Sequence, residues 1–146
     1  MEPKDYMLEA IRLASAGVEG RRGRPFGCVV VRRGEIVGRG NNAVTSTNDP
    51  TAHAEMLAFA AAAGSLTSGR RDRILGCTRE PCVMCTGAAM PAAIDTIVYG
   101  MPAPADSGTG RVVPPETAES QMPRIVGGVL EKDCSRLFRE MTQGKS

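Results

Sequence analysis

Two short segments carry most of the information in this sequence: Thr51-Ala52-His53-Ala54-Glu55 and Pro81-Cys82-Val83-Met84-Cys85. Cys82 and Cys85 are three residues apart at the expected start of a helix, so their thiols share one face of that helix. The positive end of a helix also favours the thiolates that a metal needs. Together with His53, the only histidine in the chain, they form an imidazole and two-thiolate set that suits zinc. We therefore predict one Zn²⁺ per chain, held by His53, Cys82 and Cys85.

Glu55 is the residue that would make such a zinc site catalytic. Three protein ligands leave the fourth tetrahedral position open to water, and zinc lowers the pKa of that water to about 7. A carboxylate beside it can take the proton and pass it to a substrate. Residues two apart point to nearly opposite sides of a helix, so His53 and Glu55 can share the metal only near a helix end. We therefore expect Thr51 to be the N-cap of a helix over residues 53–63.

Three alternatives compete with a catalytic zinc site. The histidine and cysteines could be packed core side chains, but their joint spacing argues against this. The second alternative is a closed structural zinc site with Cys77 as the fourth ligand. The third is a redox Cys-x-x-C pair, which would leave His53 and Glu55 without a role. We expect Cys28, Cys77 and Cys134, which lie in apolar surroundings, to be buried thiols.

Length and composition favour one globular domain. The 146 residues are enough for a single domain, residues 1–146, that buries roughly two thirds of its unfolded surface. No apolar run reaches the ~20 residues needed to cross a bilayer, and the charged N-terminal residues do not resemble a signal or transit sequence. Five cysteines, an odd number, indicate thiols or metal ligands rather than a disulfide framework. We therefore expect a cytoplasmic protein with no membrane partner.

The charge balance argues against nucleic acid as the partner. Eighteen basic and sixteen acidic residues give a formal charge of +2, and aromatic residues make up only 3% of the chain. Nucleic-acid binding usually needs a stronger basic balance and a row of aromatic side chains on which bases stack. Residues 20–24 hold three arginines and two glycines, and we expect a solvated loop there, with phosphate binding as a weaker alternative. A small molecule is therefore the expected partner.

Hydrophobic spacing and turn residues predict alternating strands and helices. Strands over 26–31 and 35–40 are separated by a tight turn and form a hairpin. The stretch 41–50 is expected to be a binding loop. The stretch 101–123 is too long for an ordinary connection, so we expect a lid or a mobile excursion. The other predicted elements are helices over 5–16, 53–63, 82–90 and 130–141, and strands over 73–78, 96–99 and 124–126.

These residues resemble the cytidine deaminase superfamily. The resemblance rests on Pro25-Phe26-Gly27, Asn41-Asn42, the run from 48 to 55, and Glu80-Pro81-Cys82-Val83-Met84-Cys85. It implies a three-layer α/β/α fold with a five-stranded mixed sheet, both zinc-bearing helices on one face of the sheet, and a homodimer. The matching reaction is hydrolytic deamination, in which Glu55 transfers the protons and an exocyclic amine leaves as ammonia.

The substrate expectation also comes from this resemblance. Within the superfamily, residues 41–55 are most similar to bacterial guanine deaminases, which implies conversion of guanine to xanthine and ammonia. In that family the asparagine that matches Asn42 binds the base, and the phenylalanine that matches Phe26 forms a wall of the pocket, roles that suit an amide and a ring. Ala54, between the histidine and the glutamate, is the third expected substrate contact.

Several departures keep other substrates open. Guanine deaminases usually carry aromatic residues where this chain has Met90-Pro91, and they close the pocket with an aromatic segment that is missing after Phe138. The alternatives are a cytosine, cytidine or purine nucleoside substrate, and a tRNA adenosine, because residues 80–85 equally resemble tRNA adenosine deaminases. A zinc-stabilised module without turnover is the remaining alternative. The low net charge argues against tRNA, and Glu55 argues against a module without turnover.

Overall fold

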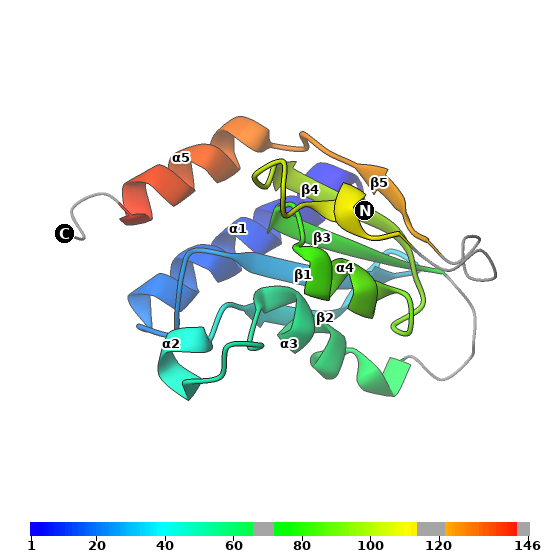
Figure 1. Cartoon of the computed structure of the whole chain (residues 1–146), viewed down its shortest axis with the longest axis horizontal. Helices are drawn as coiled ribbons and strands as arrows, with labels where there is room; N and C mark the ends of the chain where they lie inside the picture. Colours follow the sequence, from blue (N-terminus) through cyan, green and yellow to red (C-terminus); the bar gives the residue numbers. More distant parts are fainter. Residues whose placement is uncertain (66–71, 114–121, 143–146) are drawn as a thin grey trace.

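The computed structural model describes residues 1–65, 72–113 and 122–142, and a five-stranded sheet runs through their centre (Figure 1). The strand order is β2-β1-β3-β4-β5. β1 pairs antiparallel with both β2 and β3, whereas β4 runs parallel to β3 and to β5, so the sheet is mixed as expected. The strands are β1 (Gly27–Arg32), β2 (Glu35–Asn41), β3 (Arg73–Arg79), β4 (Ile94–Met101) and β5 (Arg124–Val126).

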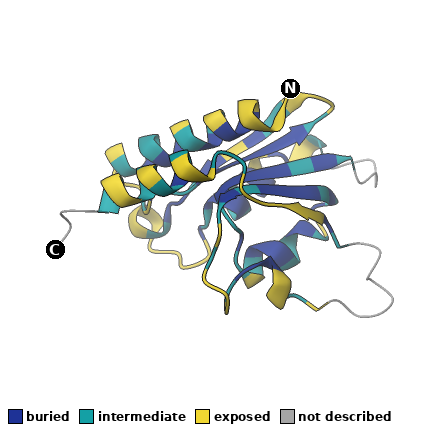
Figure 2. Ribbon diagram, turned by 90° about the horizontal axis from the view of Figure 1, so that it is seen from above, coloured by how far each residue is buried: buried dark blue, intermediate teal, exposed yellow. Residues whose placement is uncertain are grey.

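Helices cover both faces of the sheet, which confirms the predicted three layers. α1 (Pro3–Glu19) and α5 (Glu131–Thr142) lie on one face, and α3 (Ala54–Ala61) and α4 (Val83–Ala89) lie on the other (Figure 1). Each face has its own cluster of buried apolar side chains. In Figure 2 the outer faces of α1 and α5 are exposed, and the strands behind them are mostly buried. Both helices that carry predicted zinc ligands therefore share one face of the sheet.

The residue pattern explains why β1, β3 and β4 form the centre of the sheet. β1 contains a continuous apolar run, Cys28 to Val31, and all four of these residues are buried. Strands that are covered on both faces have such continuous runs, whereas edge strands alternate or become polar. The edge strand β2 has mixed exposure, and all three residues of β5 are exposed. Within the described ranges, no helix is long and apolar enough to cross a membrane.

The prediction that Thr51 is the N-cap of the helix over 53–63, which corresponds to α3, is wrong. Asp49 Oδ1 accepts hydrogen bonds from the Thr51 amide at 2.8 Å and from its hydroxyl at 2.7 Å, which hold Thr51 in a turn. His53 has extended dihedral angles (φ −71°, ψ 153°) and is itself the N-cap of α3. The helix therefore begins at Ala54, one residue later than predicted.

Two predicted loops contain helical turns. The stretch 41–50 includes the short helix α2 (Val44–Thr47), which ends at Asn48 in the left-handed region (φ 56°). A 3₁₀ turn, η2 (Thr109–Arg111), lies within the stretch 101–123, of which residues 114–121 are outside the described residues. A second 3₁₀ turn, η1 (Ala63–Ser65), follows α3. Short runs of Ser, Thr and Gly do not show the apolar spacing that reveals longer helices, so the sequence did not predict these turns.

α3 lies very close to β2, because β2 has glycine at the two contact positions, Gly38 and Gly40. A Cβ atom at Gly40 would meet the Ala54 carbonyl oxygen and lie 2.7 Å from the Ala58 amide nitrogen. At Gly38 it would lie 2.8 Å from the Ala62 Cβ. These are backbone or rigid atoms, so a larger side chain at either position would push the helix away from the sheet. The position of α3, and so of His53, depends on this close approach.

We expect Gly40→Ala to lower the free energy of unfolding by about 1–3 kcal/mol or more, because the added methyl group overpacks the β2–α3 contact. Gly87→Ala is the matched control: Gly87 is inside α4, and nothing lies within 4 Å of the added Cβ. Alanine in a helix interior is favoured over glycine, so this variant should be about 0.5–1 kcal/mol more stable. Urea denaturation followed by circular dichroism measures both. Equal stability of the two variants would contradict the proposed close contact.

Candidate active site

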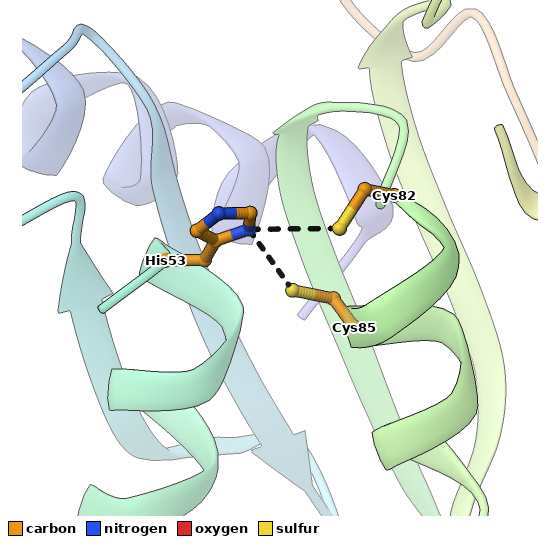
Figure 3. A group of neighbouring side chains, drawn as sticks. All are labelled: His53, Cys82 and Cys85. Carbon is orange, nitrogen blue, oxygen red and sulfur yellow. Dashed lines mark hydrogen bonds between the residues drawn. The ribbon is translucent and has the colours of Figure 1, made fainter. Parts of the chain in front are cut away.

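Three predicted metal ligands come together at the ends of two helices (Figure 3). His53 is the N-cap of α3, Cys82 is the N-cap of α4, and Cys85 lies in the first turn of α4. The His53 Nδ1 atom is 3.5 Å from the Sγ atom of each cysteine. A tetrahedral zinc ion with ordinary Zn–N and Zn–S bonds would separate a nitrogen and a sulfur ligand by ~3.6 Å. The three side chains therefore fit zinc in both type and spacing.

The electrostatics of the two cysteines also suit a metal. A hydrogen bond from the Cys85 thiol, together with backbone N–H groups and the nearby His53 ring, lowers the pKa of Cys82 to about 5. The same shared proton, together with burial, raises the pKa of Cys85. These opposite shifts favour the thiolate form of Cys82 and the thiol form of Cys85. A cation would replace that shared proton and hold both sulfurs as thiolates, which is the form that binds zinc.

Cys77 does not belong to this ligand group. Its Sγ atom lies 3.0 Å from the Sγ atom of Cys28, its neighbour on the antiparallel strand β1. Burial raises the pKa of Cys77 to about 11 and raises that of Cys28 well above its usual value. Cys28, Cys77 and Cys134 are all buried, which confirms the prediction for these three thiols. The geometry gives no support to Cys77 as the fourth ligand of a closed zinc site.

Glu55 lies in the first turn of α3 and is almost completely buried. The Cys28 thiol donates a hydrogen bond of 3.4 Å to its Oε1 atom. Burial raises the pKa of the carboxyl group, although hydrogen bonds and the nearby His53 act in the opposite direction. A carboxyl group whose pKa is raised toward neutrality can both accept and donate a proton, which is what general acid–base catalysis requires.

A cavity of about 400 Å³ opens over these residues. Phe26, Asn42, His53, Glu55 and Cys82 all line this cavity, so five of the predicted site residues meet in one place. Ala54 is different, because it is fully buried in the core cluster and does not line the cavity. Its contact with a substrate stays a prediction. The remaining lining residues are Arg24, Cys28, Val44, Thr45, Pro50, Thr78, Arg79, Glu80, Ala103 and Ser107.

Sequence reasoning predicted Phe26 as a wall residue but missed two of its neighbours, Phe138 and Arg79. The rings of Phe26 and Phe138 are stacked, with centroids 5.7 Å apart and planes 18° from parallel. Phe138 lies in α5, near the end of the chain, and it packs against the wall residue Phe26, which lies near the beginning of the chain. Arg79 lies directly before Glu80-Pro81, and this position next to the motif was the available signal. For Phe138, the sequence indicated only that the residue lies on one face of the last predicted helix.

Hydrogen bonds to the Glu80 carboxylate hold part of the stretch 101–123 beside the cavity. Its carboxylate accepts hydrogen bonds from the Ala103 amide at 3.1 Å and from the Thr109 amide and hydroxyl at 2.8 and 2.7 Å. Burial alone would raise the pKa of Glu80, but the hydrogen bonds from Thr109 and Ala103 hold it below its usual value. Residues 103–109 are therefore fixed at the cavity, where Ala103 and Ser107 form part of the wall.

We expect Thr109→Val to loosen this attachment, because it removes one donor from the Glu80 carboxylate while keeping the side-chain shape. The free energy of unfolding should fall by about 1–2 kcal/mol, and KM should rise while zinc content stays the same. Thr47→Val is the control, since the Thr47 hydroxyl bonds only to the Ala43 carbonyl oxygen of its own turn. Urea denaturation and steady-state kinetics measure both effects. An unchanged KM for Thr109→Val would show that the attachment does not shape the cavity.

We expect Cys85→Ser to lose zinc, because a neutral hydroxyl group is a poor zinc ligand compared with a thiolate. Cys77→Ala should keep one zinc per chain, since its thiol contacts Cys28 and not the ligand group. Elemental analysis after dialysis against a competing chelator measures the metal content of both variants, with circular dichroism as the check of folding. Loss of zinc from folded Cys77→Ala would instead support the closed structural site.

Deaminases of two kinds are among the proteins to which this chain is similar. Over 92% of its length, the chain is 34% identical to a tRNA-specific adenosine deaminase of Streptococcus pyogenes, and it covers 86% of that protein. It is 43% identical to the guanine deaminase of Bacillus subtilis over 68% of the chain and 64% of that enzyme. It is also 42% identical, over 92% of its length, to a tRNA(Ile)-lysidine synthase of Deinococcus radiodurans, but it spans only 24% of that protein.

Solved structures show the same two kinds of relative. A structure from a study of A-to-I editing by tRNA:A34 deaminases superimposes with a TM-score of 0.75 and 28% identity, covering 91% of this chain and 99% of that one. A guanine deaminase from Nitrosomonas europaea gives a TM-score of 0.80 at 25% identity, covering 96% of this chain and 84% of the other. The chain therefore has the same overall fold as both of these structures.

Residues 1–101 match the family model of the cytidine and deoxycytidylate deaminase zinc-binding region. The matched segment contains more than half of the chain and includes His53, Glu55, Cys82 and Cys85. The geometry of these four residues agrees with such a zinc-binding region. The chain therefore belongs to the cytidine and deoxycytidylate deaminase family, and it is an enzyme that hydrolyses a C–N bond.

Proposed function

We propose that this deaminase acts on the ring of a purine, with guanine, converted to xanthine and ammonia, as the first candidate. The observation that carries the proposal is the cavity of about 400 Å³, which is lined by two of the three predicted metal ligands, His53 and Cys82, together with Glu55, Asn42 and Phe26. Cavities that hold small molecules usually have volumes of about 300–1,000 Å³. This cavity therefore has room for a bicyclic base next to the ligand group.

Asn42 is suited to recognise the edge of the base. It is 7% exposed, and its Oδ1 atom accepts a hydrogen bond of 3.2 Å from the Val44 amide, which fixes the orientation of the side-chain amide. Within the described part of the chain, the NH₂ group of this amide has no hydrogen-bond partner. That group can donate to a ring nitrogen or carbonyl oxygen of a base. Phe26 offers an apolar face for the ring.

The proposed chemistry uses Glu55 as the proton carrier. When bound to His53, Cys82 and Cys85, zinc supplies the Lewis acidity that makes water a nucleophile near neutral pH. Glu55 takes a proton from the attacking water and delivers it to a ring nitrogen. It then takes the proton of the new hydroxyl group on the attacked carbon and passes it to the amino group, so that a carbonyl group forms as the C–N bond breaks and ammonia leaves. The hydrogen bond from Cys28 holds one carboxylate oxygen of Glu55, so the proton would move through the other oxygen.

A tRNA adenosine is the second candidate. It is supported by the similarity to the Streptococcus pyogenes tRNA-specific adenosine deaminase, which extends over 92% of this chain, against 68% for the Bacillus subtilis guanine deaminase. The guanine candidate is supported by the higher identity of 43% within its shorter match. Cytosine and cytidine remain substrates to be tested, because the family model is named for cytidine and deoxycytidylate deaminases.

The oligomeric state and the location in the cell stay predictions. The family resemblance predicts a homodimer, and size-exclusion chromatography with light scattering measures the mass in solution. One zinc per chain is likewise proposed from the single group of three ligands in the described residues.

The decisive experiment is ammonia release from a substrate panel by the zinc-loaded enzyme. The panel holds guanine, guanosine, adenosine, cytosine, cytidine and a tRNA anticodon stem-loop that contains adenosine. We expect the highest kcat/KM among the free bases for guanine. Release from the stem-loop or from cytosine, with none from guanine, would assign the substrate to another class while leaving the reaction type intact.

Glu55→Gln is the control for the chemistry in the same assay. The amide is nearly isosteric with the carboxyl group but cannot carry a proton, so kcat should fall by about 10²–10⁴-fold. Zinc content should stay at the wild-type level, because Glu55 is not in the ligand group. Turnover at the wild-type rate would show that Glu55 is not the proton carrier.

A further inference from the structure

Arg24 and Arg79 both line the cavity, and the guanidinium group of each stacks on the ring of Phe26. The guanidinium carbon of Arg24 lies 5.6 Å from the centroid of the Phe26 ring and 5.5 Å from that of Phe138. The guanidinium carbon of Arg79 lies 5.3 Å from the Phe26 centroid. Arg24 is exposed and Arg79 is half-buried, so the pair spans the passage from solvent into the cavity. Stacking on rings restrains both guanidinium groups in position.

The positive charges of this pair are not neutralised by an ion pair. Among the described residues, no carboxylate lies within ion-pair distance of Arg24 or Arg79. The Glu80 carboxylate, next in sequence, is already bound by Ala103 and Thr109. Burial, and then the positive charge of Arg24, lower the pKa of Arg79. In contrast, ion pairs are formed by Arg12, Arg32, Arg33, Arg39, Arg124 and Arg136.

We propose that Arg24 and Arg79 bind a phosphate group of the substrate, so that the base reaches the active site as part of a nucleotide. Guanidinium groups bind phosphate oxygens through paired, charge-assisted hydrogen bonds, and arginine is the residue best suited to this geometry. A phosphate group would also relieve the repulsion between the two cations. The identity of the base rests on the proposed function, whereas the phosphate site does not. A free base would then be the smallest substrate that the cavity accepts.

A second hollow of about 220 Å³ adjoins the first and shares Arg24 and Thr45 with it. Its wall contains a further arginine, Arg21, which also has no ion pair among the described residues. The ligand could therefore extend past Arg24 along the surface. The bound phosphate could come from a free mononucleotide or from the backbone of an RNA strand, and both sources offer the same chemistry.

The test compares substrates that differ only in the phosphate group. The pairs are guanosine with GMP, adenosine with AMP, and cytidine with CMP, and a short RNA strand tests the backbone source. Binding is measured by calorimetry and turnover by ammonia release, at two salt concentrations. The variants are Arg24→Gln, Arg79→Gln and the double variant. Arg12→Gln removes the same charge from α1, on the other face of the sheet, and is the matched control.

We expect the phosphate group to improve Kd and KM by about tenfold over the nucleoside, with little change in kcat. The double variant should lose this gain, so that nucleotide and nucleoside then have equal Kd and KM values. Arg12→Gln should keep the gain, and higher salt should reduce it. A gain seen only with RNA identifies the backbone as the source of the phosphate.

Three results would overturn the inference: no gain for the wild type from either the mononucleotide or the RNA strand over the nucleoside, a gain that persists in the double variant, or equal losses for both members of a pair. The last result would show that the arginines only support the aromatic wall. If the glutamine variants do not fold, Arg24→Lys with Arg79→Lys keeps the charge and should retain part of the gain. If no purine is deaminated, the proposed base is wrong, but the binding comparison still decides the phosphate site.

Discussion

The contact of the His53 ring with two cysteine sulfurs, 3.5 Å in each case, is the constraint on which the rest of the structure depends. It requires the N-termini of α3 and α4 to lie side by side on the same face of the sheet. α4 reaches this place because it follows the buried strand β3 after a short connection. α3 reaches it because Gly38 and Gly40 let the helix lie directly on β2. The sheet therefore sets the distance between ligands that are far apart in the sequence.

The two carboxyl groups near this centre, those of Glu55 and Glu80, have hydrogen-bond partners inside the protein. Glu55 receives a hydrogen bond from the Cys28 thiol, and Glu80 receives three from the segment that forms part of the cavity wall. Buried carboxylates that lack such partners would destabilise the fold. Arg24 and Arg79 differ from these groups, because they line the cavity stacked on aromatic rings and form no ion pair with any residue in the described ranges.

The ligand set and the layers of the fold could be predicted from the sequence, because both depend on local spacing. Cys82 and Cys85 share a helix face whatever surrounds them, and apolar runs identify the strands that helices cover on both sides. The position of the N-cap could not be predicted as well. Thr51 and His53 both precede the helix, and the choice between them was made by the hydrogen bonds from Thr51 to Asp49. Such competition between side chains for nearby backbone groups shifts helix ends by a residue or two.

From the sequence alone we could predict a group of metal ligands, a carboxyl group as proton carrier, and a chain that alternates between strands and helices. These properties reside in residue types and in spacings of a few positions. Only the tertiary structure decided the strand order and the walls of the cavity. Phe26 stacks on Phe138, and Arg79 stacks on Phe26, although long stretches of chain separate them. Contacts of this kind follow from the packing of whole elements, and no local pattern encodes which distant side chains will meet.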